Sequence, residues 1–270
     1  MRPEELTLRD LTTHEDYDQC VALQEATWGE GFQERVPPGM LMVAQKVGGL
    51  AVGAFDRDGA LVAFVYGLTG IKDGRLTHWS HMLAVRDDLR GRGIGQHLKL
   101  HQRDRLRELG VDRILWTFDP LVARNAHLNL NRLGARVIEY VEDVYVEDPR
   151  SRPDRLIGTD RVIVEWDIAG TPHERAGPPP ASTEAPIVSS GDPHAPPLEL
   201  PAAPRVWVEV PENIHRLQQE KPNEAVAWRA TTRRAFRHYL GLGYAVVGFA
   251  RRPDTQRCFY TVHTAGRPGA

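Results

Sequence analysis

The pattern of hydrophobic and polar residues over the first 168 positions follows two periods, and each period predicts one type of element. Apolar runs and alternation with a period of two predict strands, whereas apolar residues spaced three and four apart predict helices. We expect strands at residues 5–10, 50–55, 60–68, 77–85, 113–119, 136–146 and 160–168. We expect helices at residues 13–28, 40–47, 96–109 and 122–133.

Turn and capping residues separate these elements. Asp-Gly pairs at 58–59 and 73–74 join consecutive apolar runs, and such pairs are a strong hairpin signal. Thr12 and Glu15 have the spacing of a capping box at the start of the first helix. Gly134 follows the last of these helices as a C′ glycine. The resulting order is β-α-α-β-β-β-α-β-α-β-β, so we expect an α/β fold.

The composition changes after residue 170, which predicts a boundary between domains. Residues 171–204 contain half of the 20 prolines, and such a segment buries too little apolar surface to fold by itself. Beyond it, the pattern predicts strands at 206–210, 244–250 and 258–262 and helices at 212–219 and 223–240. We therefore expect a domain at 1–170, a linker at 171–204 and an α/β half-domain at 205–270. A core of about 65 residues is marginal alone, so the half-domain should pack on the first domain, of the same protomer or of a partner in a homodimer.

Charge and composition exclude several classes of function. The net charge is −2, because 34 lysines and arginines nearly balance 36 acidic residues, and this leaves no basic excess for bulk nucleic-acid binding. Cys20 and Cys258 are far apart and lack metal-ligand spacing, so we expect reduced thiols in a cytoplasmic protein and no metal. No apolar run approaches the ~20 residues of a membrane span, so we expect no membrane segment and no signal peptide.

Residues 82–99 contain the strongest candidate for chemistry, because an apolar strand, a glycine-dense turn and a helix start follow one another there. The glycines of the turn let backbone amides approach a ligand without an intervening Cβ. The first amides of a helix lack partners inside the helix, and its dipole favours an anion. The two arginines of the turn add positive charge. We therefore predict that this turn binds a pyrophosphate through Arg90, Gly91, Arg92, Gly93, Ile94 and Gly95.

The spacing of these residues distinguishes between families that bind such ligands. More chain precedes the glycines than a Rossmann unit needs, and no Lys-Ser or Lys-Thr pair completes a P-loop. The sequence Arg90-x-x-Gly93-x-Gly95 instead resembles the acyl-CoA loop of the GNAT N-acyltransferases, (Gln/Arg)-x-x-Gly-x-(Gly/Ala). The resemblance covers roughly the first 168 residues and includes the order of the elements.

This resemblance implies a twisted, mixed sheet in which the loop strand and the next parallel strand separate at their carboxyl ends. It implies acetyl-CoA or another acyl-CoA, such as succinyl-CoA, as the co-substrate in this split. Backbone groups of Leu83, Ala84 and Val85 would then bind pantetheine, and Asn125 lies in a helix that the family uses for the same purpose. Trp28, Phe32, Gln33 and Arg35 would contact the acceptor, or their segment is a surface loop with an aromatic plug. The implied activity is direct acyl transfer to an amine, for which we favour a small amine or an amino acid.

Three residues are candidates for proton transfer. His81 lies on the loop strand on the same side as Val85, and an imidazole suits a general base, although it could equally be paired on the sheet surface. Asp119 ends the parallel strand and could hold the acceptor, or it could cap the following helix. The tyrosine that serves as acid in the resembling family would fall at Leu130. Tyr140 is therefore a substitute candidate, with packing as its alternative role.

Two other functions stay open, and Leu130 favours the first of them. A protein that kept the loop but lost the acid would bind acyl-CoA as a non-catalytic regulator. A protein-lysine acyltransferase whose C-terminal part recognises the target is the third alternative. Release of CoA thiol with a pool of amines would distinguish the acyltransferase from the non-catalytic regulator.

Overall fold

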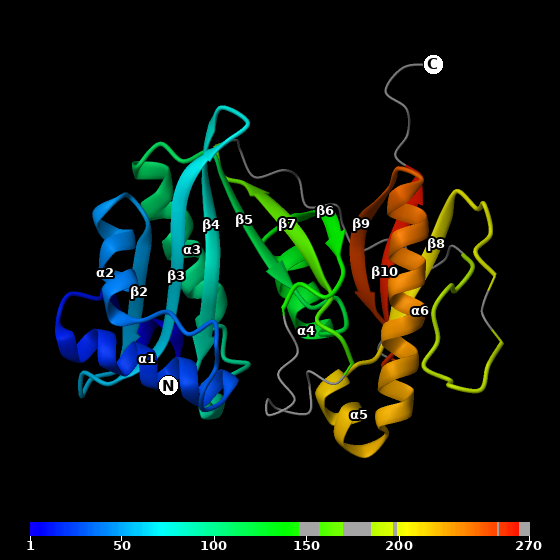
Figure 1. Cartoon of the computed structure of the whole chain (residues 1–270), viewed down its shortest axis with the longest axis horizontal. Coiled ribbons are helices and arrows are strands. Elements are labelled where there is room, and N and C mark those ends of the chain that lie inside the picture. The colour runs from blue at the N-terminus through cyan, green and yellow to red at the C-terminus, as the bar shows by residue number, and fades with distance from the viewer. Residues whose placement is uncertain (146–156, 170–184, 197–198, 253, 265–270) are drawn as a thin grey trace. The chain divides into compact units, whose positions relative to one another are not determined.

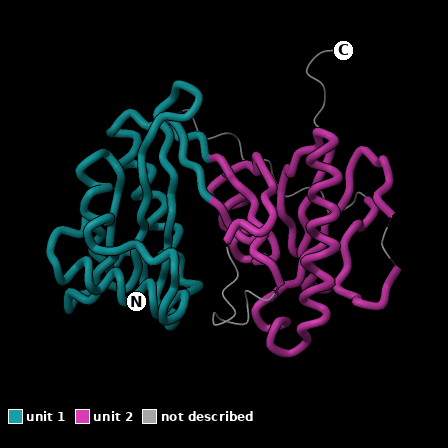
Figure 2. The backbone as a smooth tube through the Cα atoms, in the orientation of Figure 1, with its two compact units in different colours: residues 1–116, 166–171 teal, residues 117–165, 172–270 magenta. Residues whose placement is uncertain are grey.

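The computed structural model describes residues 1–145, 157–169, 185–196, 199–252 and 254–264. The chain divides into two compact units (Figure 2). The first consists of residues 1–116 and 166–171, and the second consists of residues 117–165 and 172–270. The boundary falls inside two strands, β5 (Arg113–Phe118) and β7 (Arg161–Asp167). The predicted domain limits at 170 and 204 remain a prediction, and much of the predicted linker lies outside the described residues.

The first unit is a sheet with flanking helices (Figure 1). Its strands follow the hydrogen-bonded order β1-β2-β3-β4-β5, where β1 is Thr7–Asp10, β2 is Leu50–Phe55, β3 is Leu61–Lys72 and β4 is Arg75–Val85. Its helices are α1 (His14–Trp28), α2 (Pro38–Lys46) and α3 (Ile94–Glu108), with the 3-10 turns η1 (Pro3–Glu5) and η2 (Asp87–Leu89). β1 to β4 pair antiparallel, whereas β4 and β5 pair parallel. The sheet is therefore mixed.

The turn between β3 and β4 follows from its sequence. Asp73 and Gly74 have φ values of 54° and 71°, and Lys72 pairs directly with Arg75. Two consecutive residues with positive φ match the right-handed twist of the strands, which is why Asp-Gly is favoured there. The hairpin is confirmed, and its strands are longer than the predicted 60–68 and 77–85.

The cap of the first helix differs from the prediction by one residue. Thr13, not Thr12, is the N-cap of α1, and its side chain accepts from Asp16 N at 3.1 Å. Asp16 takes the place expected for Glu15 because it also forms an ion pair with Arg9 at 2.7 Å. Arg9 lies on β1, so this choice depends on a contact between elements.

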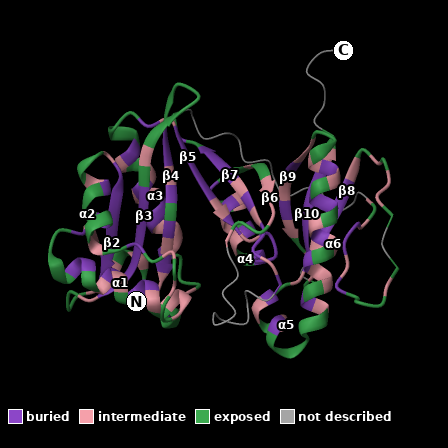
Figure 3. Cartoon of the chain, viewed as in Figure 1, coloured by how far each residue is buried: buried purple, intermediate pink, exposed green. Residues whose placement is uncertain are grey.

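The core of the first unit is formed by α1, α2 and the central strands. Its buried members are Leu11, Tyr17, Cys20, Leu23, Val36, Leu41, Ala44, Ala51, Phe55, Leu61, Phe64, Tyr66, Met82 and Ala84. Figure 3 shows buried residues along β2 and the adjoining part of β3. Each large side chain buried in this way contributes about 2 kcal/mol of transfer free energy. The apolar runs that predicted the strands are therefore the residues that stabilise the sheet.

The second unit contains the end of β5, most of β7 and the C-terminal elements. Its elements are α4 (Ala123–Ala126), the π-helix η3 (His127–Arg132), β6 (Arg136–Val141), β8 (Arg205–Val210), α5 (Ile214–Glu220), α6 (Pro222–Gly241), β9 (Tyr244–Arg251) and β10 (Cys258–Thr264). β6 and β7 pair antiparallel, and a three-stranded sheet has the order β8-β10-β9.

Residues far apart in sequence share contacts inside this second unit. Phe236 of α6 stacks on Tyr140 of β6 with ring centroids 5.4 Å apart. The Tyr260 hydroxyl donates to Pro120 O at 2.8 Å, and Asn131 Nδ2 donates to Phe249 O at 2.8 Å. α6, β9 and β10 therefore pack against the segment that follows β5.

The predicted α/β fold, with a mixed sheet and flanking helices, is confirmed. The order of the elements agrees with the sequence pattern throughout the described residues. Besides the longer β3 and β4, β6 ends at Val141, and the helix expected at 122–133 is a short α-helix followed by a π-helix. Among the residues described, no helix is both long and apolar enough to span a bilayer.

Candidate functional site

The bend between β4 and α3 presents a row of backbone amides. Gly91 and Gly93 have φ values of 78° and 85°, which residues with a Cβ rarely adopt, and Gly93 is the N-cap of α3. The first hydrogen bond of this helix runs from His97 N to Gly93 O. Within the described residues, the amides of 91–96 have no hydrogen-bond acceptor. Because they lie at the N-terminus of a 15-residue helix, these amides are suited to an anion.

Arg90 and Arg92 both contact the backbone or the acids of the bend. Arg90 Nε donates to Val85 O at 3.2 Å, and its guanidinium pairs with Asp87 at 2.6 Å. Arg92 donates to Asp88 O at 3.2 Å, and its side chain is exposed. The two arginines therefore stabilise the bend, and their contact with a phosphate stays a prediction.

β4 and β5 separate after three residue pairs. Their parallel ladder joins Thr77–Trp79 to Arg113–Leu115, and both strands continue beyond it. Among the described residues of the first unit, the stretch 80–85 of β4 pairs with β3 alone. This stretch includes the predicted pantetheine contacts Leu83, Ala84 and Val85. It also adjoins the bend, because a Cβ added to Gly95 would lie 3.4 Å from Leu83 Cδ2.

His81 lies at a bulge in the same stretch of β4. The ladder with β3 shifts between Tyr66 and Gly67, so His81 has no direct partner across it. The residue is exposed, and its ring stands nearly perpendicular to that of Tyr66 with centroids 6.1 Å apart. Desolvation of the ring lowers the pKa of His81 below its ordinary value of 6.5, and the Glu34 carboxylate offsets part of this shift. The imidazole is therefore neutral near pH 7 and able to accept a proton.

Tyr66 and Glu34 are neighbours of His81 that sequence reasoning missed. Tyr66 is 2% exposed, and burial raises the pKa of its phenol, which therefore stays protonated. Its hydroxyl forms no hydrogen bond with the described part of the chain, but it is not among the polar atoms sealed from solvent. Glu34 is half-buried in the segment between α1 and α2. Tyr66 fits the pattern of an ordinary core strand, so no signal in the sequence distinguished it.

The segment between α1 and α2 also carries two aromatic rings. Trp28 and Phe32 stack with centroids 5.4 Å apart, and Trp28 meets Phe64 edge-on at 6.4 Å. Both stacked residues are half-buried and pack against the core of the first unit. This segment was expected to lie over the acceptor, and that role stays a prediction.

Asp119 belongs to the second unit and is held by ion pairs there. Arg229 of α6 donates to Asp119 Oδ2 at 2.6 Å, and Arg161 lies 3.8 Å away. The other carboxylate oxygen accepts from Leu121 N at 2.8 Å. This contact spans two residues and closes a turn before α4, whose N-cap is Val122 and has no side-chain cap, so Asp119 does not cap the helix as the alternative interpretation expected. A role of Asp119 toward the acceptor stays a prediction.

Tyr140 lies in a second network of the same unit. Its hydroxyl donates to Asp160, which also pairs with Arg233 at 2.5 Å. Burial and this carboxylate raise the pKa of Tyr140, so its proton is held firmly. Asn125, the predicted pantetheine contact, is half-buried on α4, and Leu130 is half-buried on η3. The candidates therefore fall into two groups, with His81 and the bend in the first unit and Asp119, Tyr140 and Asn125 in the second.

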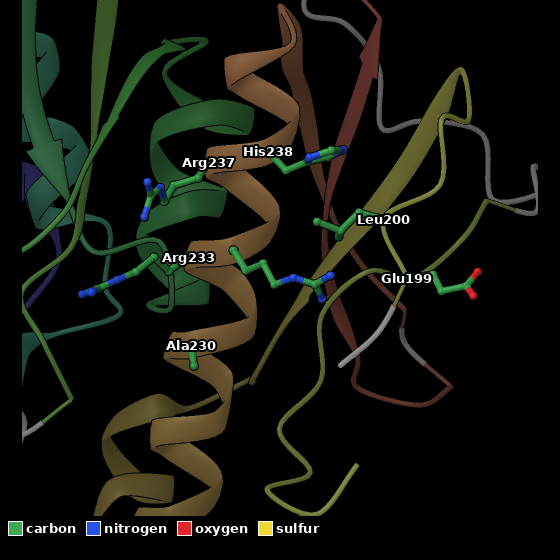
Figure 4. Close-up of a pocket in the computed structure, with 7 residues that line it drawn as sticks. Glu199, Leu200, Ala230, Arg233, Arg237 and His238 are labelled. Atoms are coloured by element: carbon green, nitrogen blue, oxygen red, sulfur yellow. The ribbon is translucent and has the colours of Figure 1, made fainter. Parts of the chain in front are cut away.

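A surface hollow of about 840 Å³ lies along α6 in the second unit. Its lining is rich in basic side chains and consists of Glu199, Leu200, Ala230, Arg233, Arg234, Arg237 and His238. Figure 4 shows Arg233 and Arg237 extending away from Leu200 and Glu199. Arg233 pairs with Asp160 and Asp143, and Arg237 pairs with Glu142 at 3.0 Å. These two arginines therefore neutralise acids of the unit itself.

Metal ligands are not gathered anywhere in the described part of the chain, where no group of three or more His, Cys, Asp or Glu residues could hold an ion. The bend, by contrast, fits a phosphate-bearing group. Its glycines leave the backbone accessible, and nothing lies within 4 Å of where a Cβ of Gly91 would be. An acyl-CoA pyrophosphate could therefore reach the amides directly.

Comparison with known proteins gives one family and a set of similar structures. The model described as "Acetyltransferase (GNAT) family" matches residues 14–146. The ribosomal-protein-S18-alanine N-acetyltransferase from Escherichia coli is 17% identical over 63% of this chain and 97% of its own, with a TM-score of 0.48. An aminoglycoside 6′-acetyltransferase type Ii is 18% identical over 62% of this chain and 99% of its own, with a TM-score of 0.47. A phosphinothricin acetyltransferase from Sinorhizobium meliloti, in complex with AcCoA, is 18% identical over 63% of this chain and 94% of its own, with a TM-score of 0.47. No curated protein matches the sequence.

Proposed function

Because residues 14–146 match the model of the acetyltransferase (GNAT) family, we propose that the chain transfers an acetyl or succinyl group from its CoA thioester to a small amine or amino acid. The observation that carries this proposal is the row of amides at 91–96, which adjoins the stretch of β4 unpaired on its β5 side. The amides would bind the pyrophosphate, and the backbone of Leu83, Ala84 and Val85 would bind the pantetheine amides.

The first unit also carries groups for the chemical step. His81 accepts a proton from the ammonium of the acceptor, whose neutral nitrogen then attacks the thioester carbonyl. Backbone amides of the bulge in β4 would stabilise the oxyanion of the tetrahedral intermediate. The carbon–sulfur bond then breaks, the attacking nitrogen loses its extra proton to become the amide, and the thiolate takes a proton, so the one proton left over is the proton on His81. The Tyr66 phenol, held protonated beside His81, is a donor that could replace the phenol missing at Leu130.

Glu34 supports a cationic acceptor. Its carboxylate lies close enough to His81 to raise the pKa of the imidazole, and an ammonium placed between the two groups would be attracted to it. The rings of Trp28 and Phe32 lie in the same segment and would cover the apolar part of a small amine.

Acyl transfer can be tested directly. The full chain is incubated with acetyl-CoA or succinyl-CoA and with pools of small amines and amino acids, and CoA thiol release is followed. We expect release that depends on one amine class, together with CoA binding in calorimetry. Absence of CoA binding would contradict the proposed function.

Replacing His81 with glutamine should reduce kcat by about 100-fold, because general-base catalysis contributes at least this much. In the wild-type chain the base is active when neutral, so kcat/KM should fall as the pH drops below 6.5 through the lowered pKa of His81. Glu34 raises this pKa, so Glu34→Gln should move the acidic limb to still lower pH. The exposed His14, changed to glutamine, is the matched control and should leave the profile unaltered. An unchanged kcat in His81→Gln would exclude His81 as the base.

A non-catalytic acyl-CoA sensor remains the second candidate function. Leu130 favours it, because this half-buried side chain offers no proton where the resembling family has a tyrosine. Tight CoA binding with no thiol release across all amine pools would support the sensor.

A further inference from the structure

Lys99, on α3, is buried, and no carboxylate in the described part of the chain pairs with it. The residue is 5% exposed, and Lys99 Nζ donates to Ser80 Oγ at 2.7 Å and to Gln102 Oε1 at 3.3 Å. The same nitrogen lies 4.1 Å from the centroid of the Trp116 ring, over its face. A lysine is almost never fully buried unless it is paired, so this position needs an explanation.

The partners of Lys99 lie at one particular place in the sheet. The ladder between β4 and β5 ends with the pair Trp79 and Leu115. Ser80 and Trp116 are the next residue on each strand. Lys99 Nζ therefore contacts both strands at the point where they separate, and Figure 1 shows α3 running beside β4.

A chain of hydrogen bonds fixes the position of these groups. Ser80 Oγ donates to Gln102 Oε1 at 3.0 Å, and Gln102 Nε2 lies 3.1 Å from His78 Nε2. His78 Nδ1 is 2.9 Å from Thr69 Oγ1, which itself donates to a backbone oxygen, that of Gly48, at 2.6 Å. Since Thr69 donates onward, His78 must donate from Nδ1 and accept at Nε2. Each group in this hydrogen-bond network is thus assigned as a donor or an acceptor in each of its bonds.

Lys99 gains or loses its charge near neutral pH because the side chain is buried. Desolvation lowers the pKa of Lys99 to about 7. His78 on β4 is the nearest titratable group of the hydrogen-bond network, and burial, with a smaller effect of the Lys99 charge, lowers its pKa to about 3, so it is neutral. Of the other charged groups nearby, Arg103 of α3 lies over the Trp166 ring, and Arg113 of β5 pairs with Asp73 at 3.1 Å.

The ammonium form fits the site better than the amine does. An ammonium has three donors, and Ser80 Oγ, Gln102 Oε1 and the face of Trp116 are three acceptors. The neutral amine has two donors and no attraction to the ring. The contacts of Lys99 with Ser80 of β4 and Trp116 of β5 should therefore weaken as the pH rises through neutrality.

We propose that Lys99 is a positioning residue for the acyl-CoA, because it joins β4 to β5 where their ladder ends and so fixes the path of the stretch of β4 that carries Leu83, Ala84 and Val85. This inference rests on the proposed function. A methionine would fill a similar volume without a buried charge and would stabilise the core. The lysine therefore makes the core less stable than a methionine would, but it fixes the position of the strand proposed to bind the cofactor.

The test compares Lys99→Met with the wild-type chain and with Lys46→Met, which removes an exposed lysine of α2. Calorimetry with CoA from pH 6 to 9 and thermal melting are the two readouts. We expect Lys99→Met to melt at a higher temperature and yet bind CoA about 5- to 10-fold more weakly at pH 6.5. The loss should shrink toward pH 9, where the wild-type lysine is itself neutral. Ser80→Ala should weaken binding in the same direction by a smaller factor.

The outcomes separate the two proposals. Equal CoA affinity of Lys99→Met and wild type at every pH would overturn the role of Lys99 while leaving the proposed function intact. A constant loss of affinity across the pH range would also overturn it, since a purely structural role predicts no pH dependence. If the wild-type chain binds no CoA at any pH, the proposed function fails, and the role of Lys99 fails with it. Lys46→Met should match wild type throughout.

Discussion

Replacing Gly93 with valine is expected to weaken CoA binding by about 100-fold, which corresponds to about 2.8 kcal/mol. Gly93 has φ of 85° at the N-cap of α3, a conformation that a β-branched residue adopts only under strain. The bend would have to change its path, and the amides of 91–96 would no longer point to one site. Calorimetry with CoA measures the loss.

Gly95→Ala is the matched control for this variant. Gly95 is helical, and a Cβ there would meet Leu83 Cδ2 at 3.4 Å and Val85 Cγ2 at 3.9 Å, which are ordinary contacts. We expect its CoA affinity to stay within about 3-fold of wild type, a difference of roughly 0.6 kcal/mol. If Gly93→Val retains wild-type affinity with an unchanged melting temperature, the amides of the bend are not the phosphate site.

Replacing Arg229 with methionine is expected to destabilise the second unit by about 3–5 kcal/mol. Arg229 is 4% exposed and bonds both Asp119, at 2.6 Å, and Ile157 O, at 3.2 Å. Its removal leaves the Asp119 carboxylate with Arg161 at 3.8 Å as its remaining cationic neighbour among the described residues. We expect the melting temperature to fall by about 10 °C.

Arg237→Met provides the comparison on the same helix. Arg237 pairs with Glu142 at 3.0 Å, but its side chain is 65% exposed, and exposed ion pairs contribute about 0–1 kcal/mol. Its melting temperature should stay within about 2 °C of wild type. Similar losses in the two variants would mean that the buried pair with Asp119 has no special role in the second unit.

The contacts of α6 also change how the C-terminal part can be tested. Phe236 and Arg229 of this helix contact Tyr140 and Asp119, which precede the proline-rich segment. A chain cut at residue 170 would lose these contacts, so loss of activity after truncation would not show that the C-terminal part recognises a target. Point variants such as Arg229→Met separate stability from recognition more cleanly.

The sequence by itself determined the order of the elements and the glycine bend before α3. Both depend on local rules, because strand and helix periods follow from burial of one face, and Gly93 with its neighbours requires a conformation that glycine alone adopts easily. Only the tertiary structure decided which polar residues meet. It placed Glu34 and Tyr66 beside His81, Arg229 on Asp119, and Lys99 where β4 leaves β5. These contacts join residues separated by up to 110 positions. Periodicity reports which face of an element is buried, but the partner across that face is set by how the elements pack.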